Sequence, residues 1–395
     1  MSPIPLSPRQ LLSTLVVALC AGAACSKSAT EVGPTVFTHP QGIVLDSVPV
    51  SARPFGLAVS ANDVLYVARL DADSLGRGDL PSTAVAPSAE VGTTPSHVAF
   101  NPAGTTAYAS DQGSRDVSVV NVATNTATAA VPVASDAWNV IVSPDGTRLY
   151  ATTDQGDLVV VNTSNNSVVK TLTLLAGDAL RGLAVDKSGR WLYVGGCLTG
   201  LVYVVDARTN AFTQAIFVGG IPQHLAVSGD GAHLYVADEI IGVDIVTVGT
   251  GAVHKIPLAG GGYGLALSPD GAQLYVSIPS RGMVAVVDPA AGSVLQTLTV
   301  SGTPRGIAFS PQEDLRHPTL ETAFLEPMTL TPPDYIMSPD DAKPSCFDIA
   351  HPGSVLHRFR ATSRRAIYTG AGCCRRDRVP DELLQLPCGG PRRTK

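Results

Sequence analysis

The chain has little charge, few aromatic side chains and no strongly basic or acidic balance. Only 15% of its 395 residues are Asp, Glu, Lys or Arg, and 5% are aromatic. The formal net charge of −6 is modest, so we expect no nucleic acid as a partner. After residue 30 no apolar run approaches the roughly 18 residues that a membrane-spanning helix needs.

Sequence motifs of the common enzyme classes are also missing. The chain has no Gly-x-Ser-x-Gly, no phosphate-binding loop, no His-Glu-x-x-His and no Cys-x-x-Cys-His. We therefore expect no cofactor and no resident metal, and the sequence favours a protein that is not an enzyme. What is abundant is glycine, with 38 residues, and proline, with 30, which together with small β-branched residues is typical of a turn-rich all-β protein.

The N-terminus predicts an exported protein. An apolar segment from Leu11 to Ala24 has the length of a signal-peptide core, and small residues precede Cys25. This segment resembles a bacterial lipoprotein signal, which implies cleavage and lipidation at Cys25; ordinary cleavage after Ala24 is the alternative. We therefore assign residues 1–25 to the signal and 26–41 to a linker. We expect the periplasm or the outer cell surface as location, with membrane contact only through the lipid.

One sequence motif recurs along most of the chain. An apolar strand, a turn similar to Ser-Pro-Asp-Gly and a strand similar to Leu-Tyr-Val-Ala follow one another. Their tyrosines are Tyr66, Tyr108, Tyr150, Tyr193, Tyr235 and Tyr275, with spacings of 42, 42, 43, 42 and 40 residues. A period near 42 that contains only short strands predicts one four-stranded blade of a β-propeller per repeat.

The repeat also resembles a known family. Leu149-Tyr150-Ala151-Thr152, Leu234-Tyr235-Val236-Ala237 and Leu274-Tyr275-Val276-Ser277, each after a Ser-x-Asp-Gly turn, are similar to the YVTN-repeat β-propellers. The resemblance covers roughly residues 42–311 and includes YncE-like envelope proteins. It implies the fold and no particular activity. The chain is more distantly similar to the lactonase-type seven-bladed propellers.

We predict that residues 42–340 form an all-β propeller with seven blades, of which six are clear. The seventh is degenerate. It begins at Pro304–Pro311, loses the repeat pattern, and would be completed by Ile43–Val50, which reads like an outermost strand. Residues 341–395 are basic and contain four cysteines, and we expect a disordered tail there. A shifted reading frame after about residue 311 is the alternative explanation.

Two aligned positions at the start of each innermost strand vary while their neighbours repeat. Such variation is typical of a binding surface. The first position holds Phe55, Ser96, Trp138, Arg181, Gln223, Tyr263 and Arg305, and the second holds Gly56, His97, Asn139, Gly182, His224, Gly264 and Gly306. The loops on the same face are expected to add Asp111, Asp154, Asp238 and Glu239.

From this ring we predict a ligand-binding site formed by eight residues: His97, Trp138, Asn139, Arg181, His224, Glu239, Tyr263 and Arg305. Arg181 and Arg305 would hold a small anionic or peptide ligand, and Trp138 and Tyr263 would stack on it. Ordinary packing beneath a solvated face is the alternative. The two histidines belong to blades on roughly opposite sides of the ring, which argues against a metal site.

These observations favour a binding or scaffold module of the cell envelope, whose partner is an unknown protein or small molecule. A lactonase-like hydrolase is the first alternative, and it would use Glu239 with Arg181 and His224. A redox accessory subunit is the second. The fold alone does not choose among them.

Overall fold

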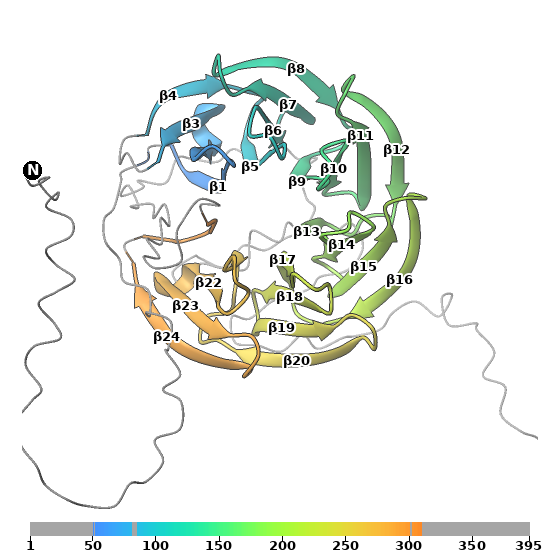
Figure 1. The fold of residues 1–395 in the computed structure, drawn as a ribbon, viewed down its shortest axis with the longest axis vertical. Coiled ribbons are helices and arrows are strands. Elements are labelled where there is room, and N and C mark those ends of the chain that lie inside the picture. Colours follow the sequence, from blue (N-terminus) through green and yellow to red (C-terminus); the bar gives the residue numbers. More distant parts are fainter. Residues whose placement is uncertain (1–49, 51, 81–84, 301, 310–395) are drawn as a thin grey trace, which may run out of the picture. The chain divides into compact units, whose positions relative to one another are not determined.

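The computed structural model describes residues 50, 52–80, 85–300 and 302–309. The predicted signal, linker and tail lie outside these residues, as does the N-terminal closing strand except for Val50. The described part contains six antiparallel sheets of four strands each. Figure 1 shows them as blades around a central channel, each with its first strand innermost and its fourth at the rim. The predicted all-β propeller fold is confirmed.

The strands follow the predicted order of one blade per repeat. Blade 1 contains β1 (Pro54–Val59), β2 (Val64–Arg69), β3 (Ser74–Asp79) and β4 (Val85–Glu90). Blade 2 contains β5 (Pro95–Phe100), β6 (Thr106–Asp111), β7 (Asp116–Asn121) and β8 (Thr126–Pro132). Blade 3 contains β9 (Ala137–Val142), β10 (Arg148–Thr153), β11 (Asp157–Asn162) and β12 (Ser167–Thr173).

The second half continues the same pattern. Blade 4 contains β13 (Leu180–Val185), β14 (Trp191–Gly196), β15 (Leu201–Asp206) and β16 (Ala211–Phe217). Blade 5 contains β17 (Pro222–Val227), β18 (His233–Asp238), β19 (Gly242–Thr247) and β20 (Ala252–Pro257). Blade 6 contains β21 (Leu265–Leu267), β22 (Leu274–Ile278), β23 (Met283–Asp288) and β24 (Ser293–Thr299).

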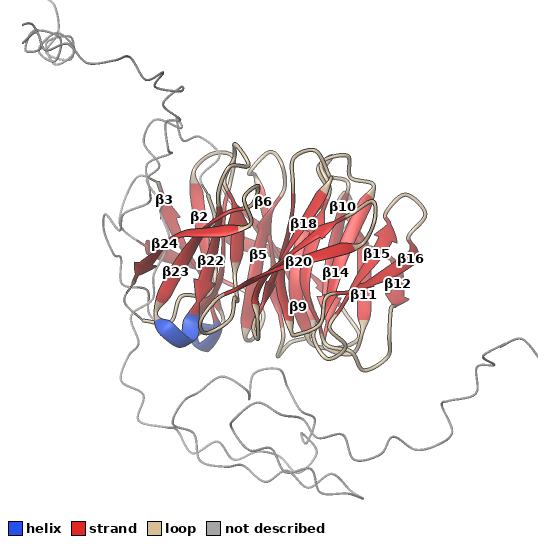
Figure 2. Ribbon diagram, turned by 90° about the horizontal axis from the view of Figure 1, so that it is seen from below, coloured by secondary structure: helices blue, strands red, loops and turns tan. Residues whose placement is uncertain are grey.

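Two short 3-10 helices, η2 (Leu70–Ala72) and η3 (Pro279–Arg281), connect the second and third strands of blades 1 and 6. Figure 2 shows both on the same side of the propeller. Among the described residues no helix is long and apolar enough to span a bilayer.

Burial falls from the inner strands of each blade to the rim. The second strand of blade 3 is buried at five of its six residues, whereas its fourth strand is exposed at six of seven. The reason is that both faces of an inner strand pack against neighbouring blades. The five largest apolar clusters each join two consecutive blades, as where Tyr150 and Leu158 of blade 3 meet Leu183 and Val194 of blade 4. The recurrent tyrosines are all buried in these interfaces.

The turns between the first and second strands form as the sequence predicts. Gly146 and Gly271 have φ values of 72° and 74°, which glycine adopts without a steric penalty. In the same turns Ser143 Oγ donates to Asp145 Oδ1 and Ser268 Oγ to Asp270 Oδ1, both at 2.6 Å. Each hairpin register is thereby set by side chains within the turn itself.

Residues 302–309 occupy the position after blade 6. Phe309 packs edge-on against Tyr275 of blade 6 with ring centroids 5.3 Å apart, and Ile307 joins the same apolar cluster. The hydroxyl of Ser277 donates to the carbonyl of Arg305 at 2.8 Å. The described residues show six blades and this segment, and the complete seventh blade stays a prediction.

Cys197 is the one cysteine among the described residues, and it is buried against Ala179 and Ile221. It is disulfide-bonded.

Candidate functional site

The variable positions lie on irregularities of the innermost strands. In blades 2, 3 and 5 the register between the first and second strands skips one residue, and these residues are Ser96, Trp138 and Gln223. Blades 1 and 4 skip two residues at the same place. Such bulges redirect a side chain away from the regular sheet faces. Of these first variable positions, Phe55, Trp138 and Gln223 line the central cavity.

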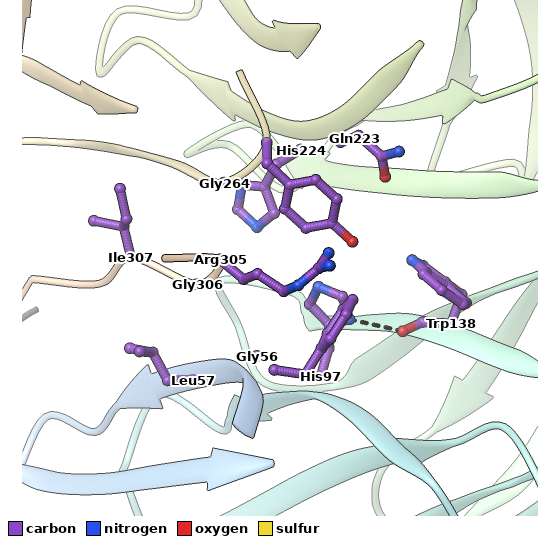
Figure 3. A pocket seen from close by; sticks show the side chains of 12 residues that line it. Gly56, Leu57, His97, Trp138, Gln223, His224, Gly264, Arg305, Gly306 and Ile307 are labelled. Carbon is purple, nitrogen blue, oxygen red and sulfur yellow. Dashed lines mark hydrogen bonds between the residues drawn. The ribbon is translucent and has the colours of Figure 1, made fainter. Parts of the chain in front are cut away.

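A small cavity lies where these positions meet (Figure 3). Its lining comes from blades 1, 2, 3, 5 and 6 and from the segment after blade 6, namely Phe55, Gly56, Leu57, His97, Trp138, Gln223, His224, Tyr263, Gly264, Arg305, Gly306 and Ile307. The cavity measures about 30 Å³, which is room for roughly two water molecules. A bound group must therefore be small, or only its end can enter.

Three aromatic side chains from three blades meet in the channel. Phe55 packs edge-on against Trp138 at 5.9 Å and against Tyr263 at 6.0 Å between ring centroids. Phe55 and Trp138 are both buried. This aromatic cluster closes much of the channel and explains why the cavity is small.

Two arginines stack on the aromatic cluster. The guanidinium carbon of Arg181 lies 3.2 Å from the ring centroid of Trp138, and that of Arg305 lies 4.7 Å from Tyr263 and 5.1 Å from Phe55. The expected ligand-stacking faces of Trp138 and Tyr263 are thus engaged by the protein's own cations.

Arg181 is a buried charge. Its side chain is 3% exposed, and Nε and Nη1 have no hydrogen-bond partner among the described residues. Burial lowers the pKa of Arg181 to about 10, so it still carries its charge at neutral pH. An uncompensated buried cation is costly unless an anion or polar groups face it.

His97 and His224 meet across the channel. Their ring centroids are 6.4 Å apart and the rings are inclined by 19°. The expectation that opposite blades keep these two histidines apart is therefore wrong, because the innermost strands crowd closely around the axis. No group of three metal-ligand side chains occurs among the described residues.

Both imidazoles are neutral at ordinary pH. Burial lowers the pKa of His97 to about 3 and that of His224 to about 4, and for His97 the neighbouring imidazole adds to the shift. Nδ1 of His97 lies 2.9 Å from the carbonyl oxygen of Trp138, which requires a proton on Nδ1. Arg305 lines the same cavity as these two rings (Figure 3).

We predict that neither ring titrates between pH 5 and 8. Nitrogen-15 NMR spectra, assigned through His97→Gln and His224→Gln, would show constant imidazole shifts over this range. In the unfolded chain both imidazoles take up a proton near pH 6.5, whereas in the folded protein they stay neutral. The contribution of these two histidines to the free energy of unfolding should therefore fall as the pH drops below about 6.5. A midpoint near 6.5 for either ring would contradict this account.

Glu239 is the carboxylate of the predicted set that lies near the arginines. The amide nitrogen of Gln223 donates to its Oε2 at 2.5 Å. Burial raises the pKa of Glu239, while the Gln223 hydrogen bond, Arg305 and Arg181 lower it. Both guanidinium groups therefore lie close enough to Glu239 to act on its charge.

The other carboxylates of the predicted ring serve different purposes. Asp111 and Asp238 are completely buried within their blades, which corrects the prediction that they face the mouth. Asp238 Oδ1 accepts from the backbone amides of Ile221, Ile240 and Ile241. Asp154 lies near enough to raise the pKa of Arg181, but its Oδ2 accepts from Gln155.

Asn139 is a structural residue in this fold. Its amide nitrogen donates to the carbonyl of Arg181 at 3.1 Å, and it links blades 3 and 4 behind the cavity. Conversely, Phe55 and Gln223 line the cavity although the predicted set omits them. Both occupy the first variable position, so the alignment of repeats contained the signal.

Comparisons with known proteins support the fold. No family model matches the chain, and no curated protein matches its sequence. A solved chain of Kuenenia stuttgartiensis hydrazine synthase is similar in structure, with a TM-score of 0.62 and 18% identity over 69% of this chain and 94% of that one.

The β-propeller domain of Myceliophteria thermophila Cps50 (Swd1) is also similar, with a TM-score of 0.58 and 16% identity over 67% of this chain and 92% of that one. At such identities the likeness concerns the fold alone. The comparisons therefore show that the chain contains a β-propeller, and they show no particular family.

Proposed function

We propose that this protein is an exported propeller of the cell envelope that binds a small anionic or peptide ligand at the mouth of its central channel. The observation that carries the proposal is the buried guanidinium of Arg181, which lacks acceptors for two of its nitrogens among the described residues. The expected signal before Cys25 supports export. β-Propellers commonly serve as binding or scaffold modules, which agrees with this role.

We further propose a seventh blade and membership of the YVTN-repeat family. The apolar contact of Val50 with Leu65 and Val67 of blade 1 supports the idea that the N-terminal chain runs along this blade. On the other side, residues 302–309 pack on blade 6 as an innermost strand would. A closed ring would leave no inner sheet face uncovered.

Photo-crosslinking in envelope preparations tests the binding role for a protein partner. A photoreactive residue replacing Ile240, which is 62% exposed beside Glu239, should yield a specific adduct. The matched control is Thr250, an exposed residue in the turn between β19 and β20, at the opposite ends of the strands. Equal adducts at both positions, or none at Ile240, would argue against the mouth as the binding face.

The lactonase-like alternative makes a separate prediction. Glu239 with Arg181 and His224 would be its catalytic set, yet Arg181 is stacked on Trp138 and the imidazole of His224 is neutral and partly buried. We expect no lactone hydrolysis by the purified protein, with or without a chelator. Hydrolysis that disappears in Glu239→Gln would establish the enzyme instead. The redox-subunit alternative gains no specific support, because the likeness to a hydrazine synthase chain concerns the fold.

A further inference from the structure

The charges around the cavity favour one kind of ligand group. Arg181 and Arg305 both lie close enough to Tyr263 and Glu239 to shift the pKa of each. Glu239 is the carboxylate that both arginines share, and it also accepts from Gln223. The two histidines are neutral and contribute no charge. Asp154 and Asp136 also act on the charge of Arg181, but Nε and Nη1 of Arg181 have no hydrogen-bond partner among the described residues, so these two donors remain for an anion.

The volume of the cavity matches a ligand group of about three heavy atoms. A cavity of about 30 Å³ holds roughly two waters, which is close to what a carboxylate would displace. The lining offers guanidinium N–H groups, which complement a planar anion with two oxygens. A bulky anion would exceed the volume of this cavity.

We infer that the mouth binds a single carboxylate group between Arg305, which lines the cavity, and Arg181, which stacks on Trp138 beside it. The remainder of the ligand extends out of the channel. This inference rests on the proposed binding function and names its ligand chemistry. The carboxylate can belong to a free organic acid or to the C-terminus of a peptide.

The position of Arg305 gives this ligand a second role. Arg305 belongs to the segment that follows blade 6, and its carbonyl accepts a hydrogen bond from Ser277. Gly306 in the same segment lies directly against the backbone of Phe55 and Leu57 in blade 1. A carboxylate that binds both Arg305 and Arg181 of blade 4 therefore links this segment to blade 4 across the channel. We expect it to raise the melting temperature of the protein.

The test is a thermal-shift titration of the full chain with acetate and acetamide at constant ionic strength. Acetate should raise the melting temperature in a saturable way, and acetamide, its neutral counterpart, should not. Arg305→Met should raise the half-saturating acetate concentration by about tenfold or more, since hydrogen bonds to charged groups are lost. Glu239→Gln should lower that concentration several-fold, because it removes the competing negative charge.

The matched control is Arg190→Met. Arg190 also stacks on a tryptophan, with its guanidinium carbon 4.5 Å from the Trp191 ring centroid, but it lies at the surface and pairs with Asp206. This variant should titrate like the wild type. Equal acetate responses in the Arg305 and Arg190 variants, or equal responses to acetate and acetamide, would overturn the inference. If Arg305→Met does not fold, Glu239→Gln decides, and an unchanged affinity there is evidence against a charge-selective site.

The source of the carboxylate is resolved by a second pair of probes, N-acetyl-alanyl-alanine and its C-terminal amide. Saturable binding of the free acid alone identifies a peptide terminus as an acceptable source, and binding of acetate alone points to small organic acids. Failure of every carboxylate overturns this inference and leaves the crosslinking test at Ile240 unaffected, so the broader binding role is judged independently.

Discussion

Replacing Gly264 with alanine is expected to destabilise the protein by about 2–3 kcal/mol through overpacking and a lost hydrogen bond. A Cβ at this position would lie 1.9 Å from the carbonyl oxygen of Arg305, which is a backbone atom with little freedom to move. The segment after blade 6 would have to shift away from blade 6. The hydrogen bond between Ser277 and Arg305 would then be lost as well.

Urea unfolding measures this effect, and Gly229→Ala is the matched control. A Cβ on Gly229 meets no atom within 4 Å, and its φ is not positive, so we expect a change within about 0.5 kcal/mol. Because Arg305 would move, Gly264→Ala should also weaken the response to acetate. Equal stabilities of the two variants would show that residues 302–309 do not pack tightly on blade 6.

A second large effect concerns Asp111, which is completely buried in blade 2. Burial raises the pKa of this carboxyl to about 8, and the nearby Asp116 contributes. Its Oδ1 has no partner among the described residues, and a proton there would let it donate to Asp116. We therefore infer that folded Asp111 is protonated at neutral pH.

The sign of the pH effect follows from this proton. Between pH 5 and 8 the unfolded chain has lost the Asp111 proton while the folded protein retains it. The contribution of Asp111 to the free energy of unfolding should therefore fall with rising pH, by at most about 1.4 kcal/mol per pH unit, opposite in sign to that of the two histidines. Asp111→Asn mimics the protonated form, because it keeps an acceptor for the Ser118 amide and offers a donor to Asp116.

Urea unfolding at pH 5 and pH 8 tests this prediction. Relative to the wild type, Asp111→Asn should gain stability at pH 8 and gain little at pH 5. Asp230→Asn is the control, since hydrogen bonds from Ser228 and Ala232 lower the pKa of this exposed carboxyl. The difference in the free energy of unfolding between Asp230→Asn and the wild type should be the same at both pH values. A pH-independent effect of Asp111→Asn would mean that the buried carboxyl is ionised throughout.

Most of the blade architecture could be predicted from sequence, because each repeat contains its own turn and register signals. The six aligned tyrosines, for example, all lie in the second strand of their blades. Apolar alternation and Ser-x-Asp-Gly turns are local features, and every blade repeats them. Closure of the ring was harder to predict. The repeat pattern ends after Pro311, and closure depends on contacts between residues that are distant in sequence.

The candidate site was only partly predictable for a related reason. Aligned positions indicated which residues point to the axis, but not how narrow the channel is. The 6.4 Å separation of His97 and His224, the stacking of Arg181 on Trp138 and the burial of Asp238 all depend on distances between blades. Such distances follow from the number of blades and from the bulges at the inner strands, which repeat spacing alone does not specify.

The most direct test of the account is a crystal structure of the full chain grown in propionate. The account predicts a carboxylate in the central cavity, with its oxygens within hydrogen-bond distance of the guanidinium groups of Arg305 and Arg181. Water alone in that cavity, with propionate bound elsewhere or not at all, would contradict it.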